Sequence, residues 1–171
     1  MLTEFVRDQY FTVAWFGLMA FVWFGCSQED PPRPWRAWLG VGSVLGLGFA
    51  AGFGVLTARN WSSPTALDGR YQWFGVLVAV EVVAAGAGCF FLARRGASRW
   101  MAWWVAVVVA AHFLPLAFLL DDAGIAVVGV VQLVALGAVV PRLRGAEWPT
   151  SRLAGPVMGA ILLVSASIGA L

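Results

Sequence analysis

Two titratable side chains at membrane depth, Glu81 and His112, are the residues of this sequence best suited to chemistry. Each lies inside a long apolar segment, Glu81 in residues 73–93 and His112 in residues 101–120. An ionisable group within a bilayer is energetically expensive, so such a residue marks a functional site by default. A carboxyl group and an imidazole can exchange a proton near neutral pH, and the pair therefore predicts general acid–base chemistry.

The composition indicates the kind of protein in which this pair lies. Of 171 residues, 61% are hydrophobic and only 12% are charged, whereas about a quarter of a soluble domain is charged. The apolar residues form blocks of about twenty, the length that a helix needs to cross the hydrocarbon core. A net charge of +2 is too small to indicate nucleic-acid binding. The sequence therefore predicts an all-α integral membrane bundle of six transmembrane helices in a single domain, residues 1–171, with spans at about 10–25, 37–58, 73–93, 101–120, 125–140 and 153–171.

The arginines predict how this bundle is oriented. Eight of them lie in the connections after spans one, three and five, and three lie on the opposite side. Cytoplasmic loops are enriched in basic residues, so we expect both termini outside the cytoplasm. Glu4 and Asp8 flank Arg7, unlike the positive start of a signal peptide, so we expect the first span to be retained. The absence of lysine and the excess of Ala, Gly and Val favour a bacterial protein, which we expect as a multi-pass protein of the inner membrane.

Glycines four residues apart predict close packing of helices. Such pairs occur in spans two and six: Gly42 with Gly46, Gly48 with Gly52, and Gly155 with Gly159. Small residues at this spacing allow two helix backbones to approach each other. The glycine-rich faces and the small size of the chain also favour a homo-oligomer, surrounded by membrane lipids.

Glu81, His112 and Gln132 are predicted to lie at one depth in the membrane. Counted from the outer ends of their spans at about 1.5 Å per residue, Glu81 and His112 lie roughly 12 Å down and Gln132 roughly 13 Å down. Small residues follow Glu81 at helical spacing and flank Gln132, which indicates packed rather than lipid-facing surfaces. We therefore expect Glu81 and Gln132 to point into the bundle.

The predicted catalytic set is Glu81 as proton donor, His112 as its partner or as the base, and Gln132 as an orienting group. Burial disfavours the charged form of each titratable group, whereas a close partner favours the ion pair. A structural alternative stays open, in which the three side chains form a hydrogen-bonded network that only fixes helix order, at under about 1 kcal/mol per polar pair. A carboxylate is a costly choice for that purpose, which favours a functional role.

The residues predicted to contact a substrate are Trp15, Trp104, Phe113 and Pro115. Most tryptophans suit an interfacial belt, but Trp15 and Trp104 lie deeper, where an aromatic face would stabilise a cationic intermediate. Pro115 removes a backbone donor, and a kink there would open a small pocket beside the imidazole of His112.

Two other groups of residues bear on metals and cofactors. With one histidine in the chain, a multi-histidine metal or haem site is excluded, and we expect no metal and no other cofactor. Asp121 and Asp122 could suit a metal or acid site, but two carboxylates at a helix start more often complement the dipole of that helix.

The stretch His112-Phe113-Leu114-Pro115-Leu116-Ala117, with Glu81 one helix earlier, resembles small bacterial polytopic membrane proteins that pair a mid-helix Glu with a His-Phe-x-Pro-Leu motif. The resemblance covers spans three and four, and it supports the two polar residues without implying a chemistry. The design is also similar, by analogy alone, to membrane-embedded terpenoid and sterol cyclases and isomerases, which use a buried acid among aromatic side chains.

Three functions remain open on this basis. The leading hypothesis is an enzyme of the isomerase or lyase class that isomerises or cyclises a lipid or isoprenoid, a hydrophobic small molecule, within the bilayer. The second is a proton-coupled small-molecule carrier or channel with Glu81 and His112 as the relay. It needs a polar path to both faces, whereas the inner halves of spans three to five are almost wholly apolar. The third is a non-catalytic membrane subunit or scaffold.

Overall fold

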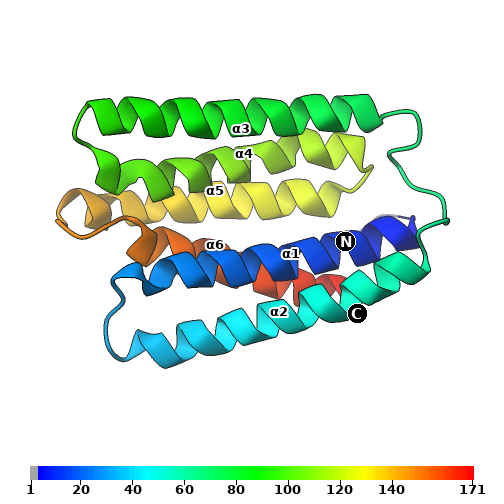
Figure 1. The fold of residues 1–171 in the computed structure, drawn as a ribbon, viewed down its shortest axis with the longest axis horizontal. Coiled ribbons are helices and arrows are strands. Elements are labelled where there is room, and N and C mark those ends of the chain that lie inside the picture. The colour runs from blue at the N-terminus through cyan, green and yellow to red at the C-terminus, as the bar shows by residue number, and fades with distance from the viewer. Residues whose placement is uncertain (1–3) are drawn as a thin grey trace.

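The computed structural model describes residues 4–171, and every regular element in that part of the chain is helical. In order, the elements are α1 (Val6–Cys26), η1 (Ser27–Glu29), α2 (Trp35–Arg59), α3 (Tyr71–Arg94), η2 (Ser98–Trp100), α4 (Met101–Leu119), α5 (Ala123–Arg144) and α6 (Ser151–Gly169). Six of these helices are long and apolar enough to cross a membrane, and they lie roughly side by side (Figure 1). For the described residues, the prediction of an all-helical chain with six apolar spanning helices is confirmed.

The helices extend beyond most of the predicted spans. α1 begins at Val6, four residues before the expected start, and α5 continues to Arg144. The predicted fifth span ends at Val140, just before Pro141, which lacks a backbone donor. The helix continues through Pro141 because only one intrahelical bond is lost there, close to the end of α5.

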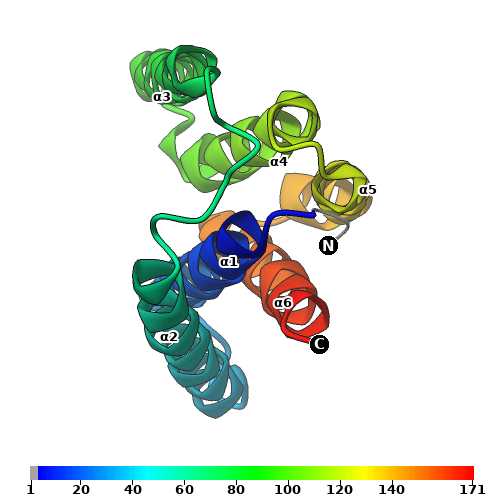
Figure 2. The same ribbon diagram turned by 90° about the vertical axis from the view of Figure 1, so that its right-hand side faces the viewer.

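The six helices pack unevenly. α1 packs on α2 and α6, whereas α4 packs on α5 and, less extensively, on α6. α3 is the outermost helix, since within the described chain its backbone lies close to α4 and η2 alone (Figure 2). Its first residue, Tyr71, also accepts a hydrogen bond of 2.7 Å from Arg7 of α1. No residue of α3 is fully buried. The main apolar core therefore lies among the other helices, and its largest members include Phe16, Ile125, Met158 and Leu162.

The crossing of α1 and α2 depends on two glycines that face each other. A Cβ added to Gly46 would lie 2.6 Å from the carbonyl oxygen of Gly17, and a Cβ added to Gly17 would lie 2.7 Å from the carbonyl oxygen of Gly46. The glycines therefore let the two backbones touch. The predicted packing of Gly42 is also confirmed, since it lies against the ring of Phe24.

Polar contacts fix the connections at both ends of the bundle. We call the end that holds the α1–α2, α3–α4 and α5–α6 connections the basic end, and the opposite one the N-terminal end (Figure 1). At the basic end, the Thr150 hydroxyl donates to the carbonyl oxygen of Arg99 at 2.7 Å, and Ser151 donates to Glu29 at 2.7 Å. At the N-terminal end, Arg70 pairs with Asp121 at 3.2 Å.

Asp8 anchors the long α2–α3 connection at the N-terminal end. Its carboxylate is buried and accepts hydrogen bonds of 2.7 Å from the hydroxyl of Thr65 and from the backbone N–H of Ala66. Arg7 binds the same connection by donating to the carbonyl oxygen of Trp61 at 2.8 Å. This anchoring role was not predictable from the sequence, because the partners of both residues lie more than fifty positions away.

Replacing Asp8 with alanine is expected to free this connection. Two buried donors would lose a charged acceptor, at a cost of about 1–3 kcal/mol in the free energy of unfolding. In detergent, the variant should unfold at a lower temperature and be cut faster by trypsin at Arg70. Asp68→Ala, which removes an exposed carboxylate from the same connection, is the matched control and should behave like the wild type. Equal trypsin sensitivity of Asp8→Ala and the wild type would contradict the anchoring role.

Candidate intramembrane acid–base site

Glu81 and His112 meet at the contact between α3 and α4. The Nδ1 atom of His112 lies 3.0 Å from the Oε2 atom of Glu81, an ion-pair distance, although the approach lacks the alignment of a hydrogen bond. The side chain of His112 is 8% exposed and the side chain of Glu81 is 23% exposed. The sequence placed both residues at one depth, and the structure brings their side chains into contact. Their role in chemistry stays a prediction.

A second contact fixes the register of α3 on α4. The indole N–H of Trp104 donates to the carbonyl oxygen of Ala84 at 3.1 Å. The same ring lies on Gly88, where an added Cβ would overlap it. Ala84 and Gly88 follow Glu81 by three and seven residues and so share its helix face. The small-residue stripe beside Glu81 is therefore the surface that packs on α4, with the indole of Trp104 against its backbone. A contact of Trp104 with a substrate stays a prediction.

Gln132 does not join the Glu81–His112 pair. Its side chain is fully buried on α5, and neither of its amide atoms has a hydrogen-bond partner among the described residues. Gly129, one turn earlier, lies against the carbonyl oxygen of Ala110 on α4. Because α4 lies between α3 and α5, the three polar residues do not form the hydrogen-bonded network considered above.

The other predicted substrate contacts divide between the core and the surface. Phe113 is buried, with its ring 5.5 Å from that of Phe16 and edge-on to His112 at 6.3 Å. Pro115 lies within α4 and is exposed. Trp15 is 45% exposed, stacks on Phe11 and lines a cleft of about 280 Å³ between α1 and α2.

The Asp121–Asp122 turn is accounted for by structural contacts. The carboxylate of Asp122 accepts a hydrogen bond of 2.8 Å from the backbone N–H of Gly124 and caps the start of α5. Asp121 has a φ angle of +49° and pairs with Arg70. This arrangement agrees with the interpretation of two carboxylates that complement the following helix.

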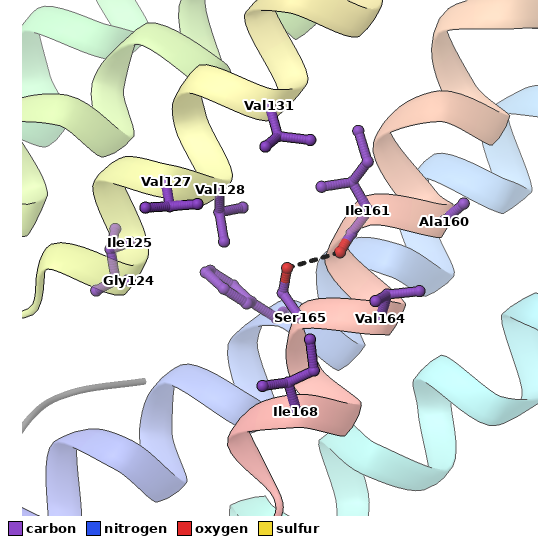
Figure 3. A pocket seen from close by; sticks show the side chains of 11 residues that line it. Gly124, Ile125, Val127, Val128, Val131, Ala160, Ile161, Val164, Ser165 and Ile168 are labelled. Carbon is purple, nitrogen blue, oxygen red and sulfur yellow. Dashed lines mark hydrogen bonds between the residues drawn. The ribbon is translucent and has the colours of Figure 1, made fainter.

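A well-formed cleft lies away from the acid–base pair, since neither Glu81 nor His112 lines it. It has a volume of about 500 Å³ and runs between α5 and α6 (Figure 3), and Phe16 of α1 is also among its lining residues. Neither this cleft nor the one beside Trp15 is lined by His112 or Pro115. The pocket expected beside the imidazole is therefore not one of these two clefts. Sequence reasoning missed the larger cleft, because apolar side chains at span positions look the same whether they face lipid or a groove.

No known protein-family model matches the chain, and neither the curated proteins nor the solved structures contain a match to it. Any proposal for its function therefore rests on the Glu81–His112 pair and its surroundings. A carboxyl group and an imidazole in contact at membrane depth can pass a proton between them, or one can donate a proton while the other accepts one. The partly exposed carboxyl group is the member of the pair that an incoming molecule reaches more readily.

Proposed function

We propose that the protein is an enzyme that isomerises or cyclises a lipid or isoprenoid within the bilayer. The observation that carries this proposal is the 3.0 Å approach of Glu81 to His112 between two apolar helices. Moving a double bond requires an acid that protonates one of its carbons, which leaves a cation on the other carbon. A base then removes a proton from the next carbon along the chain, so the new double bond forms with no net gain of protons. Glu81 serves as the donor and His112 as its partner or as the base.

The edge position of α3 favours a substrate that arrives from the membrane. Around Glu81, the apolar residues Val80, Val82 and Val83 are 60–68% exposed, so lipid surrounds this part of the helix. A hydrophobic substrate reaches the carboxyl group by lateral diffusion and needs no path through the bundle. This arrangement suits a lipid or isoprenoid better than a water-soluble compound.

The distribution of the arginines supports a proposal for the orientation of the protein in the membrane. Eight of the eleven arginines lie at the basic end or in the turns that lead to it. We place this end in the cytoplasm and both termini outside it, in the inner membrane of a bacterium.

The first test compares lipid extracts of a host that expresses the wild type with extracts of a host that expresses Glu81→Gln. The substitution keeps the size of the side chain but removes the transferable proton, so a product seen with the wild type should fall at least about 100-fold. Mass spectrometry of the organic extracts measures the product. Val83→Ala, an exposed substitution on the same helix, is the control and should retain the product. If the wild type and Glu81→Gln are both folded and expressed at equal levels, identical extracts would refute the proposal that the protein is an enzyme.

A proton-coupled carrier or channel is the second candidate, favoured by the one-sided packing of α3 on α4. A helix held at a single face can move against its neighbour when the charge state of Glu81 or His112 changes. This function predicts proton flux into proteoliposomes on acidification of one side. The enzyme predicts no such flux.

A further inference from the structure

The cleft between α5 and α6 presents a continuous hydrocarbon surface. Its walls are formed by branched apolar side chains of both helices, among them Val128, Val131 and Ile161 (Figure 3). Ser165 is the polar side chain in the wall, and its hydroxyl donates to the carbonyl oxygen of Ile161 in its own helix at 2.8 Å. The cleft therefore offers no free polar group along these walls.

Two residues that line the cleft, Phe16 and Ile125, belong to the buried core. Phe16 is 1% exposed and packs on the ring of Phe113, and Ile125 is also 1% exposed. Asp122 caps the start of α5 beside them. Protein interiors rarely contain voids larger than a water molecule, whereas sites for small molecules typically measure about 300–1,000 Å³. At about 500 Å³, the cleft is of the size that holds a ligand.

Gln132 continues the row of residues that lines the cleft on α5. It follows Val128 by four residues and Ile125 by seven, and residues at these spacings share a helix face. Both residues line the cleft, whereas Gln132, one turn further along α5, is not among its lining residues. Its side chain is fully buried, and neither amide atom has a partner among the described residues.

A buried amide without partners is unfavourable in a helix bundle. Burying such a group unpaired costs about 1–3 kcal/mol, and the cost is removed when a donor or an acceptor reaches it. A glutamine amide can donate to a carbonyl oxygen and can accept from a hydroxyl group. A group that can bind one oxygen of either type therefore lies one helical turn beyond the apolar residues of α5 that line the cleft.

We propose that this cleft binds a single hydrocarbon chain that ends in a hydroxyl or carbonyl group, with Gln132 as the partner of that terminal oxygen. The chain enters from the bilayer between α5 and α6 and lies along the apolar walls. Its oxygen reaches the amide about 12 Å from Gly124, given eight residues at 1.5 Å each. The site is separate from Glu81 and His112, because α4 lies between α3 and α5. The proposal therefore does not rest on the acid–base pair.

The test uses two photoactivatable probes, a medium-chain primary alcohol and the alkane of equal length, each carrying a mid-chain diazirine. The protein is in lipid nanodiscs, and labelled peptides are mapped by mass spectrometry. In the wild type, both probes should label residues 124–131 and 160–168. The alcohol should bind roughly five- to tenfold more tightly, as one neutral hydrogen bond predicts. Ala160→Phe, at the exposed rim of the cleft, should reduce labelling by both probes.

Gln132→Leu isolates the contribution of the amide. Labelling of the cleft should remain, and the alcohol and the alkane should bind with equal affinity. The variant should unfold at a temperature no lower than the wild type, since it removes an unpaired buried amide. Equal affinity of the two probes in the wild type would overturn the proposal. So would an undiminished preference for the alcohol in Gln132→Leu, or labelling confined to other helices.

Discussion

Replacing Gly46 with leucine is expected to separate α1 from α2 and to destabilise the whole bundle. An added Cβ would lie 2.6 Å from the carbonyl oxygen of Gly17 and 2.9 Å from the backbone N of Phe21. Both neighbours are backbone atoms of α1, so no side chain can rotate away and the helices themselves must move apart. Inserting atoms into a packed interior typically costs 1–3 kcal/mol. We expect the upper end of that range, about 3 kcal/mol or more, in the free energy of unfolding.

Gly48→Leu is the matched control for this variant. It makes the same chemical change on the same helix two residues away, where an added Cβ meets no atom of the chain within 4 Å. Both variants change the helix propensity of α2 equally, so the difference between them isolates the crossing with α1. Circular dichroism during unfolding in mixed micelles measures the difference. Equal midpoints for Gly46→Leu and Gly48→Leu would contradict the close contact of α1 and α2.

The glycines of α2 also show what the sequence could and could not predict. Pairs four residues apart indicated close packing at Gly42 with Gly46 and at Gly48 with Gly52. The first pair packs on α1, whereas the second meets no atom of the chain. The two pairs are offset by six residues and so point in different directions around the helix. Spacing identifies a surface that allows close approach, but the partner depends on how the helices are arranged.

The sequence predicted that Glu81 and His112 lie at one level and that Gln132 points into the bundle, and the first two residues are in contact while Gln132 is buried. It did not predict which helix lies beside Gln132. Glu81 and His112 lie on consecutive antiparallel helices, so equal depth was enough to bring them together. Gln132 has a similar depth, but its helix packs on the other side of α4. Hydropathy identifies spans because every helix must be apolar, and it does not show which helices are neighbours. The burial of Asp8 and the α5–α6 cleft depend on such long-range neighbours, so neither was predictable from the sequence.

Substituting Glu81 and His112 together is expected to reduce product formation no further than substituting either one alone. If the two groups transfer a proton as one unit, Glu81→Gln and His112→Gln should each lower the rate about 10²- to 10⁴-fold. The double variant should stay within the range of the single ones, because effects within one catalytic unit are not additive. Product formed per amount of folded protein, measured by mass spectrometry, gives the rates of all four proteins.

This double-mutant cycle separates a working pair from one that only joins two helices. A structural pair would leave the rate unchanged and alter the stability by about 0.6 kcal/mol, the average for polar contacts between membrane helices. Two groups that act on the substrate independently would give a double variant whose loss equals the product of the single losses. The contact at 3.0 Å favours coupling, because a proton held by one group changes the field at the other. If the rate reduction of the double variant equals the product of the two single reductions, Glu81 and His112 act in separate steps of the reaction. If the rates of all variants are unchanged, neither residue takes part in the reaction.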